Sequence, residues 1–452
     1  MAHGKLPVWF PALKVKEDRR SGLSGCHSCV GPAAANRGSG NHRSARRTKE
    51  KYMKRRLIVS VCAAAAVAIS ALPGHAAQTT LVVDDDGVQC PDADFTSIQA
   101  AVNAASAGST IKVCPGTYNE IVTANTANLR LVGPRTPSAC TQPTTPDPNT
   151  DAIIQADNDA GGVVNLLENG IRFMRFTVQN NTLGAGIVTG ATFSGHRVLQ
   201  NVVQNNVQGV YFNSNGTTAS SVDQNCIRQN NQPGAAGGNG IYSDLGLSNA
   251  NIRQNTFYQN ESSGIVLTGL APGAVSNVNI VANTSQEDGS LLAVFNSSGT
   301  EVRSNTVRNN AGSAIFVGND NTGLEILSNN ISGSARGVRT STAFGGGPNT
   351  NLRISSNEIT NSTSSDGIVA GTNSLTNSVI SSNTATNNPR DGIRIEAGGN
   401  AGNRILSNTL SNNAEHDCHD DTVGAGTAGT ANTWLANSGV TENRPGLCDG
   451  TA

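Results

Sequence analysis

Short runs of alternating apolar and polar residues recur along the chain from about Val198 to Asn437, and Asn or Gly separates one run from the next. Alternation with a period of two is the spacing of a β-strand and not of a helix. Gly and Asn suit the turns between strands, because both tolerate a positive φ. The clearest copies are V-L-Q-N-V-V-Q-N-N-V-Q-G-V (198–210), I-R-Q-N-T-F-Y-Q-N-E-S-S-G-I (252–265), V-R-S-N-T-V-R-N-N (302–310), I-S-S-N-E-I-T-N-S-T-S-S-D-G-I (354–368) and I-L-S-N-T-L-S-N-N (405–413).

The first Asn of each copy measures the length of the repeat. These residues are Asn201, Asn225, Asn255, Asn283, Asn305, Asn329, Asn357, Asn383 and Asn408, and the gaps between them are 24, 30, 28, 22, 24, 28, 26 and 25 residues. Such a period indicates stacked supersecondary units, since one copy cannot bury its own apolar face. Helical repeats would need long amphipathic runs and leucine-rich repeats a fixed Leu framework, and the sequence has neither. The pattern therefore predicts a parallel β-helix with one coil per copy.

The column of asparagines has a structural explanation in such a fold. Stacked coils place equivalent residues about 4.8 Å apart, so that each Asn amide can hydrogen-bond to the next one along the axis. We therefore expect these asparagines to hold turns together and not to take part in chemistry.

The period, the Asn column and the pattern N-x-[IV]-x-x-N followed by G-[IV] resemble the right-handed parallel β-helix proteins of the pectate-lyase-like superfold, over about residues 80–450. The resemblance implies an all-β, right-handed parallel β-helix of about 10–12 coils. It leaves the function open, because this superfold includes lyases, glycoside hydrolases, esterases, epimerases and non-enzymatic adhesins.

A secretory signal peptide is expected at residues 53–77. Met53-Lys-Arg-Arg precedes an apolar segment from Leu57 to Leu72, which is followed by Pro73-Gly-His-Ala-Ala77. The apolar segment is short against the roughly 20 residues of a membrane span, so we expect cleavage before Gln78, secretion, and no transmembrane segment in the mature chain. Residues 1–52 are basic and rich in Ser and Gly, and we expect a disordered extension or a mis-assigned translation start.

The remaining chain divides into four predicted parts. Residues 78–133 form an N-terminal cap and first coil, with a strand at 81–83, a short capping helix at 95–105 and strands beginning at 110 and 116. Gly116, Tyr118 and Glu120 in this part resemble the opening of pectin methylesterases, whose catalytic motifs do not follow, and we expect a structural role for Tyr118. Residues 134–151 hold five prolines and form a loop, 152–415 form the repeats, and 416–452 form the last coil and C-terminal cap, an ending that resembles secreted β-helix repeat proteins of unassigned activity.

Removing the leader changes the charge and the cysteine count. The chain has 31 Lys+Arg and 32 Asp+Glu, of which residues 1–77 hold 14 and 3, so that 17 and 29 remain and the mature net charge is −12. This acidity argues against a nucleic-acid partner. Six cysteines also remain, which indicates disulfides in an exported chain. We expect Cys90 to pair with Cys114 and Cys418 with Cys448, which leaves Cys140 for Cys226.

Candidate binding residues follow from aligning the strands after the turn glycines. The second residue after each Gly should point outward because successive side chains alternate faces. That row contains Tyr211, Tyr242, Val266, Phe316, Arg339, Val369 and Arg394, and the fourth position contains Asn213, Asp244, Thr268, Gly318, Ser341, Gly371 and Glu396. If Asp417 takes the place of the Gly in the final coil, His419 and Asp421 continue both rows. We predict that Tyr211, Tyr242, Asp244 and Phe316 bind a polysaccharide or cell-wall glycan; a solvated face with incidental aromatic side chains is the alternative.

Catalytic candidates lie at the other end of the same rows. A lyase needs a base and a cation that neutralises the uronate carboxylate, and Arg339, Arg394 and Glu396 suit these roles. A glycoside hydrolase needs two carboxylates, for which Glu396 and Asp421 lie on neighbouring coils. The sequence leaves open whether the chain is a lyase, hydrolase or epimerase, a binding protein, or a non-catalytic surface or adhesion solenoid. We expect a monomer.

No complete metal site can be assigned from the sequence. The segment His416-Asp-Cys-His-Asp-Asp421 and the turns Asp84–Asp86 and Asp157–Asp159 offer ligands, and Ca²⁺ is the cofactor that such turn carboxylates would bind. Solvated end-cap residues and ordinary turn acids remain the alternative.

Overall fold

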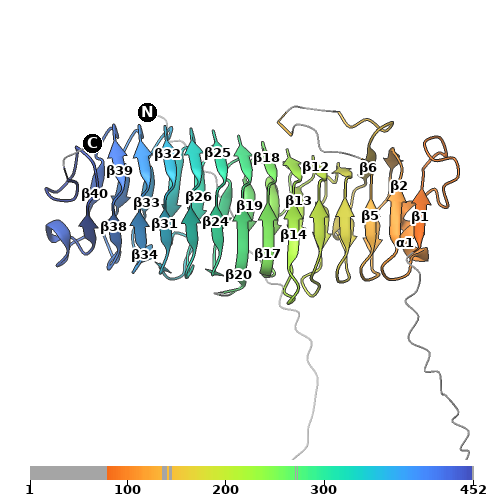
Figure 1. The fold of residues 1–452 in the computed structure, drawn as a ribbon, viewed down its shortest axis with the longest axis horizontal. Coiled ribbons are helices and arrows are strands. Elements are labelled where there is room, and N and C mark those ends of the chain that lie inside the picture. The colour runs from red at the N-terminus through yellow and green to blue at the C-terminus, as the bar shows by residue number, and fades with distance from the viewer. Residues whose placement is uncertain (1–78, 135–139, 142–144, 270, 272, 450–452) are drawn as a thin grey trace, which may run out of the picture. The chain divides into compact units, whose positions relative to one another are not determined.

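The computed structural model describes residues 79–134, 140–141, 145–269, 271 and 273–449. The predicted extension at 1–52 and signal peptide at 53–77 lie outside these residues. The described strands stack as a parallel β-helix (Figure 1), as the repeat predicts. Within the described ranges, no helix is long and apolar enough to cross a membrane.

Each coil contributes strands to three long parallel sheets, which we call sheets 1, 2 and 3 in chain order. Sheet 1 contains, in spatial order, β1 (Thr80–Val83), β2 (Thr110–Val113), β5 (Arg130–Val132), β8 (Arg172–Met174), β11 (Arg197–Leu199), β14 (Ser220–Asp223), β17 (Leu247–Arg253), β20 (Val275–Val281), β24 (Glu301–Arg303), β27 (Glu325–Leu327), β31 (Arg353–Ser355), β35 (Val379–Ser381), β38 (Arg404–Leu406) and β41 (Thr433–Leu435), with β23 (Ser297–Ser298) beside β20. Sheet 2 contains β3 (Gly116–Tyr118), β6 (Ala152–Gln155), β9 (Thr177–Gln179), β12 (Val202–Gln204), β15 (Cys226–Arg228), β18 (Thr256–Tyr258), β21 (Thr284–Gln286), β25 (Thr306–Arg308), β28 (Asn330–Ser332), β32 (Glu358–Thr360), β36 (Thr384–Thr386) and β39 (Thr409–Ser411).

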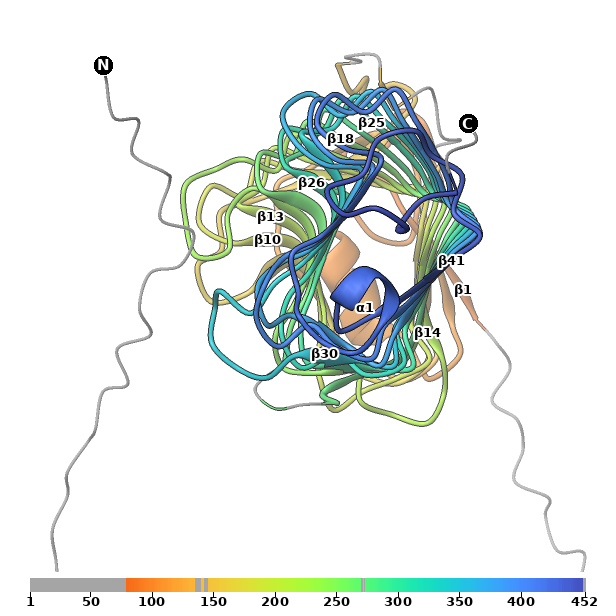
Figure 2. The same cartoon turned by 90° about the vertical axis from the view of Figure 1, so that its left-hand side faces the viewer.

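Sheet 3 is the sheet that carries the predicted outward rows. It contains β4 (Val122–Ala124), β7 (Gly162–Leu166), β10 (Ala185–Thr189), β13 (Gln208–Phe212), β16 (Asn239–Ser243), β19 (Ser263–Leu267), β22 (Leu292–Val294), β26 (Ser313–Val317), β29 (Arg336–Thr340), β33 (Ile368–Ala370), β37 (Ile393–Ile395) and β40 (Cys418–Asp420). A short pair, β30 (Asn349–Thr350) and β34 (Leu375–Thr376), lies outside the three sheets. Seen end on in Figure 2, β13 and β26, β18 and β25, and β14 and β41 lie on three sides of the solenoid. In the described residues two sheets have 12 strands each, in agreement with the expected 10–12 coils.

Stacked apolar columns fill the space between the sheets. Ile315, Val338, Ile368 and Ile393 occupy equivalent positions on successive coils of sheet 3, and each is at most 1% exposed. Burying a side chain of this size stabilises the fold by about 1.5–3 kcal/mol relative to exposure. One column of alternate residues per strand thus supplies the core, which explains the period of two in the sequence.

The predicted asparagine ladder is present at the turn between sheets 1 and 2. Asn305 accepts hydrogen bonds through Oδ1 from the backbone N (2.9 Å) and Nδ2 (3.0 Å) of Asn283. Its own Nδ2 donates to Asn329 Oδ1 (2.9 Å) and to the Ile280 carbonyl (3.0 Å). The same side-chain bonds run without interruption from Asn201 to Asn437. The ladder therefore satisfies buried polar groups along the solenoid from β11 to β41.

Gly and Asn adopt positive φ angles at many turns, as expected, for example Asn205, Asn309 and Gly333. In the ladder turns, however, the residue before each ladder Asn adopts them. Examples are Gln200 at 57°, Ser304 at 55° and Ser407 at 53°. The cost of a left-handed residue is offset by the stacked amide bonds that the next residue makes.

The predicted capping helix is shorter than expected. Helix α1 spans Ile98–Ala104 because Phe95 forms a bridge with Val83 and Ser97 serves as the N-cap. The Glu120 carboxylate accepts hydrogen bonds from the backbone N of Ile98 (2.8 Å) and of Gln99 (2.9 Å). This carboxylate satisfies N–H groups that every helix start leaves without an intrahelical partner. Ile98, Ala101 and Val102 are buried in the core; that α1 is needed to close this end stays a prediction, as do the domain boundaries.

Tyr118 has the structural position that we expected. It is 2% exposed, and its hydroxyl donates to the Cys114 carbonyl at 2.9 Å. Together with Glu120, it links the first coil to the segment before it, so this motif supports the fold at its N-terminal end.

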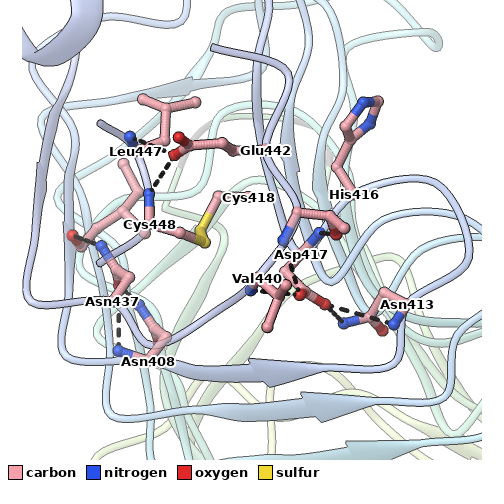
Figure 3. Close-up of a disulfide and its surroundings, with 12 residues drawn as sticks. Asn408, Asn413, His416, Asp417, Cys418, Asn437, Val440, Glu442, Leu447 and Cys448 are labelled. Carbon is pink, nitrogen blue, oxygen red and sulfur yellow. Dashed lines mark hydrogen bonds between the residues drawn. A yellow bond between two sulfur atoms is a disulfide. The ribbon is translucent and has the colours of Figure 1, made fainter. Parts of the chain in front are cut away.

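All three predicted disulfides are present: Cys90–Cys114, Cys140–Cys226 and Cys418–Cys448. The second joins the proline-rich loop to β15, and the described residues of that loop (134, 140–141 and 145–151) form no strand. Figure 3 shows the surroundings of the third bridge, where the Asp417 side chain points toward Asn413 and Val440, and Glu442 toward Leu447 and Cys448. These bonds fix the last coil, which carries part of the candidate site.

Candidate functional site

The outward row predicted from the turn glycines is a real column of sheet 3. Strand pairing aligns Tyr211, Tyr242, Val266, Ala293, Phe316, Arg339, Val369, Arg394 and His419 on successive coils. Ala293 was missed because no Gly precedes its strand. The row is not uniformly open, since Val266 and Val369 are only 7% and 4% exposed.

The expectation that the fourth position also points outward is wrong for part of the chain. Asn213 is 1% exposed and Ser341 5%. The strand β13 ends at Phe212 and β29 at Thr340, so the alternation stops one residue earlier. Asn213 Oδ1 instead accepts hydrogen bonds from Ser243 Oγ (2.9 Å) and from the backbone N of Leu245 (3.0 Å).

Three of the four predicted glycan-binding residues lie together at the N-terminal end of the row. The rings of Tyr211 and Tyr242 stack with centroids 6.0 Å apart, and the Tyr211 hydroxyl donates to Asp244 Oδ1 at 2.6 Å. Because the two rings face each other, their edges and the Asp244 carboxylate are what they present to a ligand.

The fourth predicted residue, Phe316, belongs to a separate aromatic cluster. Its ring centroid lies 5.8 Å from that of Phe295 and 5.9 Å from that of Phe344. Phe344, in the loop after β29, is 52% exposed. Aligning the strands after the turn glycines missed Phe344 because it lies outside any strand.

Arg339 follows Phe316 on the next coil and is half-buried. It makes no hydrogen bond or ion pair with any described residue. Burial, and after it the charge of Arg339, lower the pKa of the nearby Arg336. Two guanidinium groups thus lie close together beside the aromatic cluster, which makes this part of the face suited to an anionic ligand.

A compact group of charged residues ends the row at the last two coils. The side chain of Asp391 is 0% exposed, and His416 Nδ1 lies 3.1 Å from its Oδ1 and His419 Nδ1 3.1 Å from its Oδ2. His419 Nε2 lies 2.8 Å from Asp421 Oδ1. Burial alone would lower the pKa of His419, but its contacts with Asp391 and Asp421 outweigh burial and raise that pKa. Burial likewise raises the pKa of Asp391, and the contacts with His419, His416 and Arg394 lower it further than burial raises it.

The predicted catalytic residues divide between this group and its surroundings. Arg394 lies between two carboxylates, with Nη2 3.4 Å from Asp421 Oδ2 and Nη1 3.7 Å from Asp391 Oδ2. Glu396 accepts hydrogen bonds from the backbone N and Oγ1 of Thr372, both at 2.9 Å. Arg339 and Arg394 are two coils apart, as expected from the alignment.

Asp391 is the central residue that sequence reasoning missed. It precedes Gly392, where an added Cβ would lie 2.7 Å from Asn413 Nδ2 and 2.8 Å from the Asp417 carbonyl. The backbone at Gly392 packs against the next coil, so Gly392 and Ile393 both face inward. The residues that flank this pair, Asp391 and Arg394, therefore project outward together. The signal was available in the sequence, since the equivalent positions on successive coils are Arg336, Asp366, Asp391 and His416, all polar.

The acidic turns considered for Ca²⁺ have structural partners. Asp84 Oδ2 accepts from the Cys90 backbone N (2.6 Å) and Asp85 Oδ2 from that of Thr117 (2.9 Å). Asp157 Oδ1 accepts from the backbone N and Oγ1 of Thr182, both at 2.8 Å. These bonds fit ordinary turn acids.

The comparison with known families defines the class of protein. The model of the right handed beta helix region matches residues 224–344 and 293–449, which together make up half of the chain. The chain therefore belongs to this family of right-handed β-helix proteins, as the repeat indicated. No curated protein sequence matches it.

Several solved structures resemble this chain. The A-module of the Azotobacter vinelandii mannuronan C-5 epimerase AlgE6 has a TM-score of 0.50 at 16% identity, over 77% of this chain and 94% of the module. The catalytic unit of a GH87 α-1,3-glucanase from Streptomyces thermodiastaticus has a TM-score of 0.49 at 14% identity, over 76% of this chain and 66% of that one. A mannuronic acid specific polysaccharide family 6 lyase from human gut microbiota has a TM-score of 0.45 at 14% identity, over 75% and 82% of the two chains. At 16% identity, the similarity to the epimerase module indicates a shared fold alone.

Proposed function

We propose that the protein is exported and binds an acidic polysaccharide along the outer face of sheet 3. The observation that carries this proposal is Arg339, a half-buried guanidinium without a hydrogen bond or ion pair among the described residues, one coil from the Phe316 aromatic cluster. Arg forms paired hydrogen bonds with carboxylates, and an exposed ring such as Phe344 can pack against the apolar face of a sugar. Three disulfides support export, since disulfides persist in oxidising compartments.

The repeat of the fold supports a linear ligand. Successive coils are about 4.8 Å apart, which is close to the repeat of one sugar along an extended glycan. A chain lying parallel to the solenoid axis would therefore meet a new coil with each sugar. In this arrangement a uronate carboxylate pairs with Arg339, neighbouring sugars pack on Phe316 and Phe344, and Tyr211, Tyr242 and Asp244 bind sugars farther along.

Binding can be tested by titrating the full chain with polyuronates and neutral glycans. We expect Arg339→Gln to weaken polyuronate binding at least about tenfold, the cost of a lost charged hydrogen bond, and to leave neutral glycans unaffected. The matched control is Arg308→Gln, which removes an exposed Arg from sheet 2. Equal losses from both substitutions would mean unspecific attraction between charges and would contradict the proposed site.

Turnover of the bound glycan is the second candidate, favoured by the position of Arg394 next to Asp421 on the adjacent coil. An Arg that neutralises the uronate carboxylate suits β-elimination, and Glu396 with Asp421 offers the two carboxylates of a hydrolase. The ultraviolet absorbance of unsaturated products and a reducing-end assay distinguish the two reactions. We expect the double variant Arg394→Gln with Glu396→Gln to lose turnover and to retain glycan binding. If neither assay detects a product with the unsubstituted chain, the protein is an epimerase, a binding protein or a non-catalytic surface solenoid.

A further inference from the structure

We propose that Asp391, His416 and His419 bind one divalent transition-metal ion, for which Zn²⁺ has the best chemical fit. The three residues belong to the last two coils of sheet 3, and one ligand atom of each lies within 4.8 Å of the others. The proposal concerns these three side chains only and does not depend on glycan binding.

The Asp391 carboxylate is placed between the two imidazole rings. His416 Nδ1 lies 3.1 Å from Asp391 Oδ1, and His419 Nδ1 lies 3.1 Å from Asp391 Oδ2. Two ligand atoms of one tetrahedral Zn²⁺ are about 3.3 Å apart, because Zn–N and Zn–O bonds are about 2.0–2.2 Å long. Each imidazole therefore already lies close to one carboxylate oxygen at the separation that a shared ion requires, and a shared ion would bring the ligand atoms, now within 4.8 Å of one another, closer together.

Two of the atoms concerned make no hydrogen bond in the part of the chain that the structure describes. Asp391 Oδ2 and His419 Nδ1 are buried, and although they lie 3.1 Å apart their directions do not form a hydrogen bond. The Asp391 side chain is 0% exposed and that of His419 11%. Buried polar atoms without a hydrogen bond destabilise a fold, and a metal ion bound between these two atoms would remove that cost.

The surroundings of His419 are those of a metal ligand. Its Nε2 lies 2.8 Å from Asp421 Oδ1. An ionised carboxylate only accepts hydrogen bonds, so Nε2 carries a proton, and a metal ion that displaces the Nδ1 proton would meet a lone pair directed at Asp391. Histidine ligands commonly donate their second N–H to a carboxylate in this way. On the other side, the backbone N of His416 donates to Asp391 Oδ1 at 3.1 Å and holds the carboxylate in place.

The donor set decides which ion fits. Two imidazoles and one carboxylate favour Zn²⁺ and its transition-metal neighbours, whereas Ca²⁺ takes six to eight oxygen ligands. Three protein ligands leave a coordination position for water or a sugar oxygen. Arg394 competes for the same carboxylate, with Nη1 3.7 Å from Asp391 Oδ2, and metal binding requires it to turn toward Asp421, which its Nη2 already contacts.

The test is a titration of the metal-free full chain with Zn²⁺ and with Co²⁺, followed by calorimetry and visible absorption. Residues 1–77 hold further His and Cys residues, so the readout is the difference between variants. We expect His416→Ala, whose side chain is 33% exposed, to remove one equivalent of Zn²⁺ and the absorption of tetrahedral Co²⁺. Asp391→Asn and His419→Ala should do the same, and unchanged thermal unfolding of His416→Ala shows that the fold persists.

Two controls make the result decisive. Asp86→Asn, in the exposed part of the acidic turn that also offers three carboxylates, should leave the stoichiometry unchanged. A hundredfold excess of Ca²⁺ should not displace Zn²⁺. The same stoichiometry in the full chain and in His416→Ala, or displacement by Ca²⁺, would overturn the proposal, whereas the glycan titration with Arg339→Gln reports on the sheet 3 face by itself.

Discussion

At the scale of single residues, most buried polar side chains form hydrogen bonds with one another. Asp288 does so too, but it is an ionisable acid among neutral side chains. Asp288 ends a second ladder of side-chain hydrogen bonds, which runs through Asn206, Asn230 and Asn260. In it, Asn260 donates from its backbone N (2.8 Å) and Nδ2 (2.9 Å) to Asp288 Oδ1. Ser285 Oγ donates to its Oδ2 at 2.6 Å. Burial raises the pKa of Asp288 from 3.8 to about 7, although these hydrogen bonds lower it in part.

Stability should therefore depend on the ionisation of Asp288. Between about pH 4 and pH 7 the folded state binds a proton that the unfolded state has released, so the free energy of unfolding falls as pH rises through this window. We expect Asp288→Asn to remove this slope and to stabilise the protein above pH 7 by at most about 4 kcal/mol. Denaturant titrations at pH 5 and pH 8 measure both effects. The exposed Asp92→Asn is the control, and an unchanged pH slope in Asp288→Asn would contradict the argument.

His196 should make the stability depend on pH in the opposite direction, and at acidic pH. It is fully buried, and neither ring nitrogen has a hydrogen-bond partner among the described residues. Burial lowers its pKa from 6.5 to about 4, so below about pH 6.5 the unfolded state gains a proton that the folded state does not, and stability falls until about pH 4. We expect His196→Leu to flatten this decrease and to add about 1–3 kcal/mol by removing unsatisfied polar atoms. Thermal unfolding from pH 4 to pH 8 tests it; a steeper acid decrease would count against this explanation.

At the scale of one element, the turn between sheets 1 and 2 depends on its ladder amide. Asn329 Oδ1 accepts from the backbone N (3.0 Å) and Nδ2 (2.9 Å) of Asn305, and its Nδ2 donates to Val302 O and Asn357 Oδ1, both at 2.9 Å. We expect Asn329→Ala to destabilise the protein by about 3 kcal/mol or more, because buried groups on two coils lose their partners. Its sequence neighbour Asn330 is exposed, and Asn330→Ala should cost less than about 1 kcal/mol in the same denaturant titration. Similar losses at both positions would argue against the ladder as the source of stability.

At the scale of the whole molecule, a solenoid transmits a defect only to neighbouring coils. Each coil contacts the coils before and after it, so stability is close to a sum of local terms. The Cys418–Cys448 bridge closes a separation of 30 residues at the C-terminal end, and such a bridge contributes about 2–4 kcal/mol.

Replacing both cysteines, Cys418→Ser with Cys448→Ser, should therefore loosen one end only. We expect faster amide hydrogen exchange in β39, β40 and β41 and unchanged exchange in β13, β16 and β19. Loss of protection in all six strands at once would show that the solenoid unfolds as one cooperative unit. Because β40 carries His419, zinc affinity should fall in this variant even though each proposed ligand is retained.

The amino-acid sequence by itself determined the coil. Alternating apolar residues, the asparagine column and six cysteines specify strands, turns and covalent links through local spacing, and the structure agrees with the predicted repeats, ladder and disulfide pairs. Strand pairing also follows from the repeat, which is why the row from Tyr211 to His419 could be aligned correctly except at Ala293.

Only the tertiary structure decided which outward residues meet. Asp391 and His419 are 28 positions apart, and their contact depends on how the backbone at Gly392 packs against the next coil. The burial of Val266, Val369 and Asn213, and the joining of Phe344 to Phe316, likewise depend on where strands end and on how loops fold over the face. A repeat sets the position of a residue along the axis, but the direction and partners of its side chain depend on atoms from other coils, which the spacing within one coil does not contain.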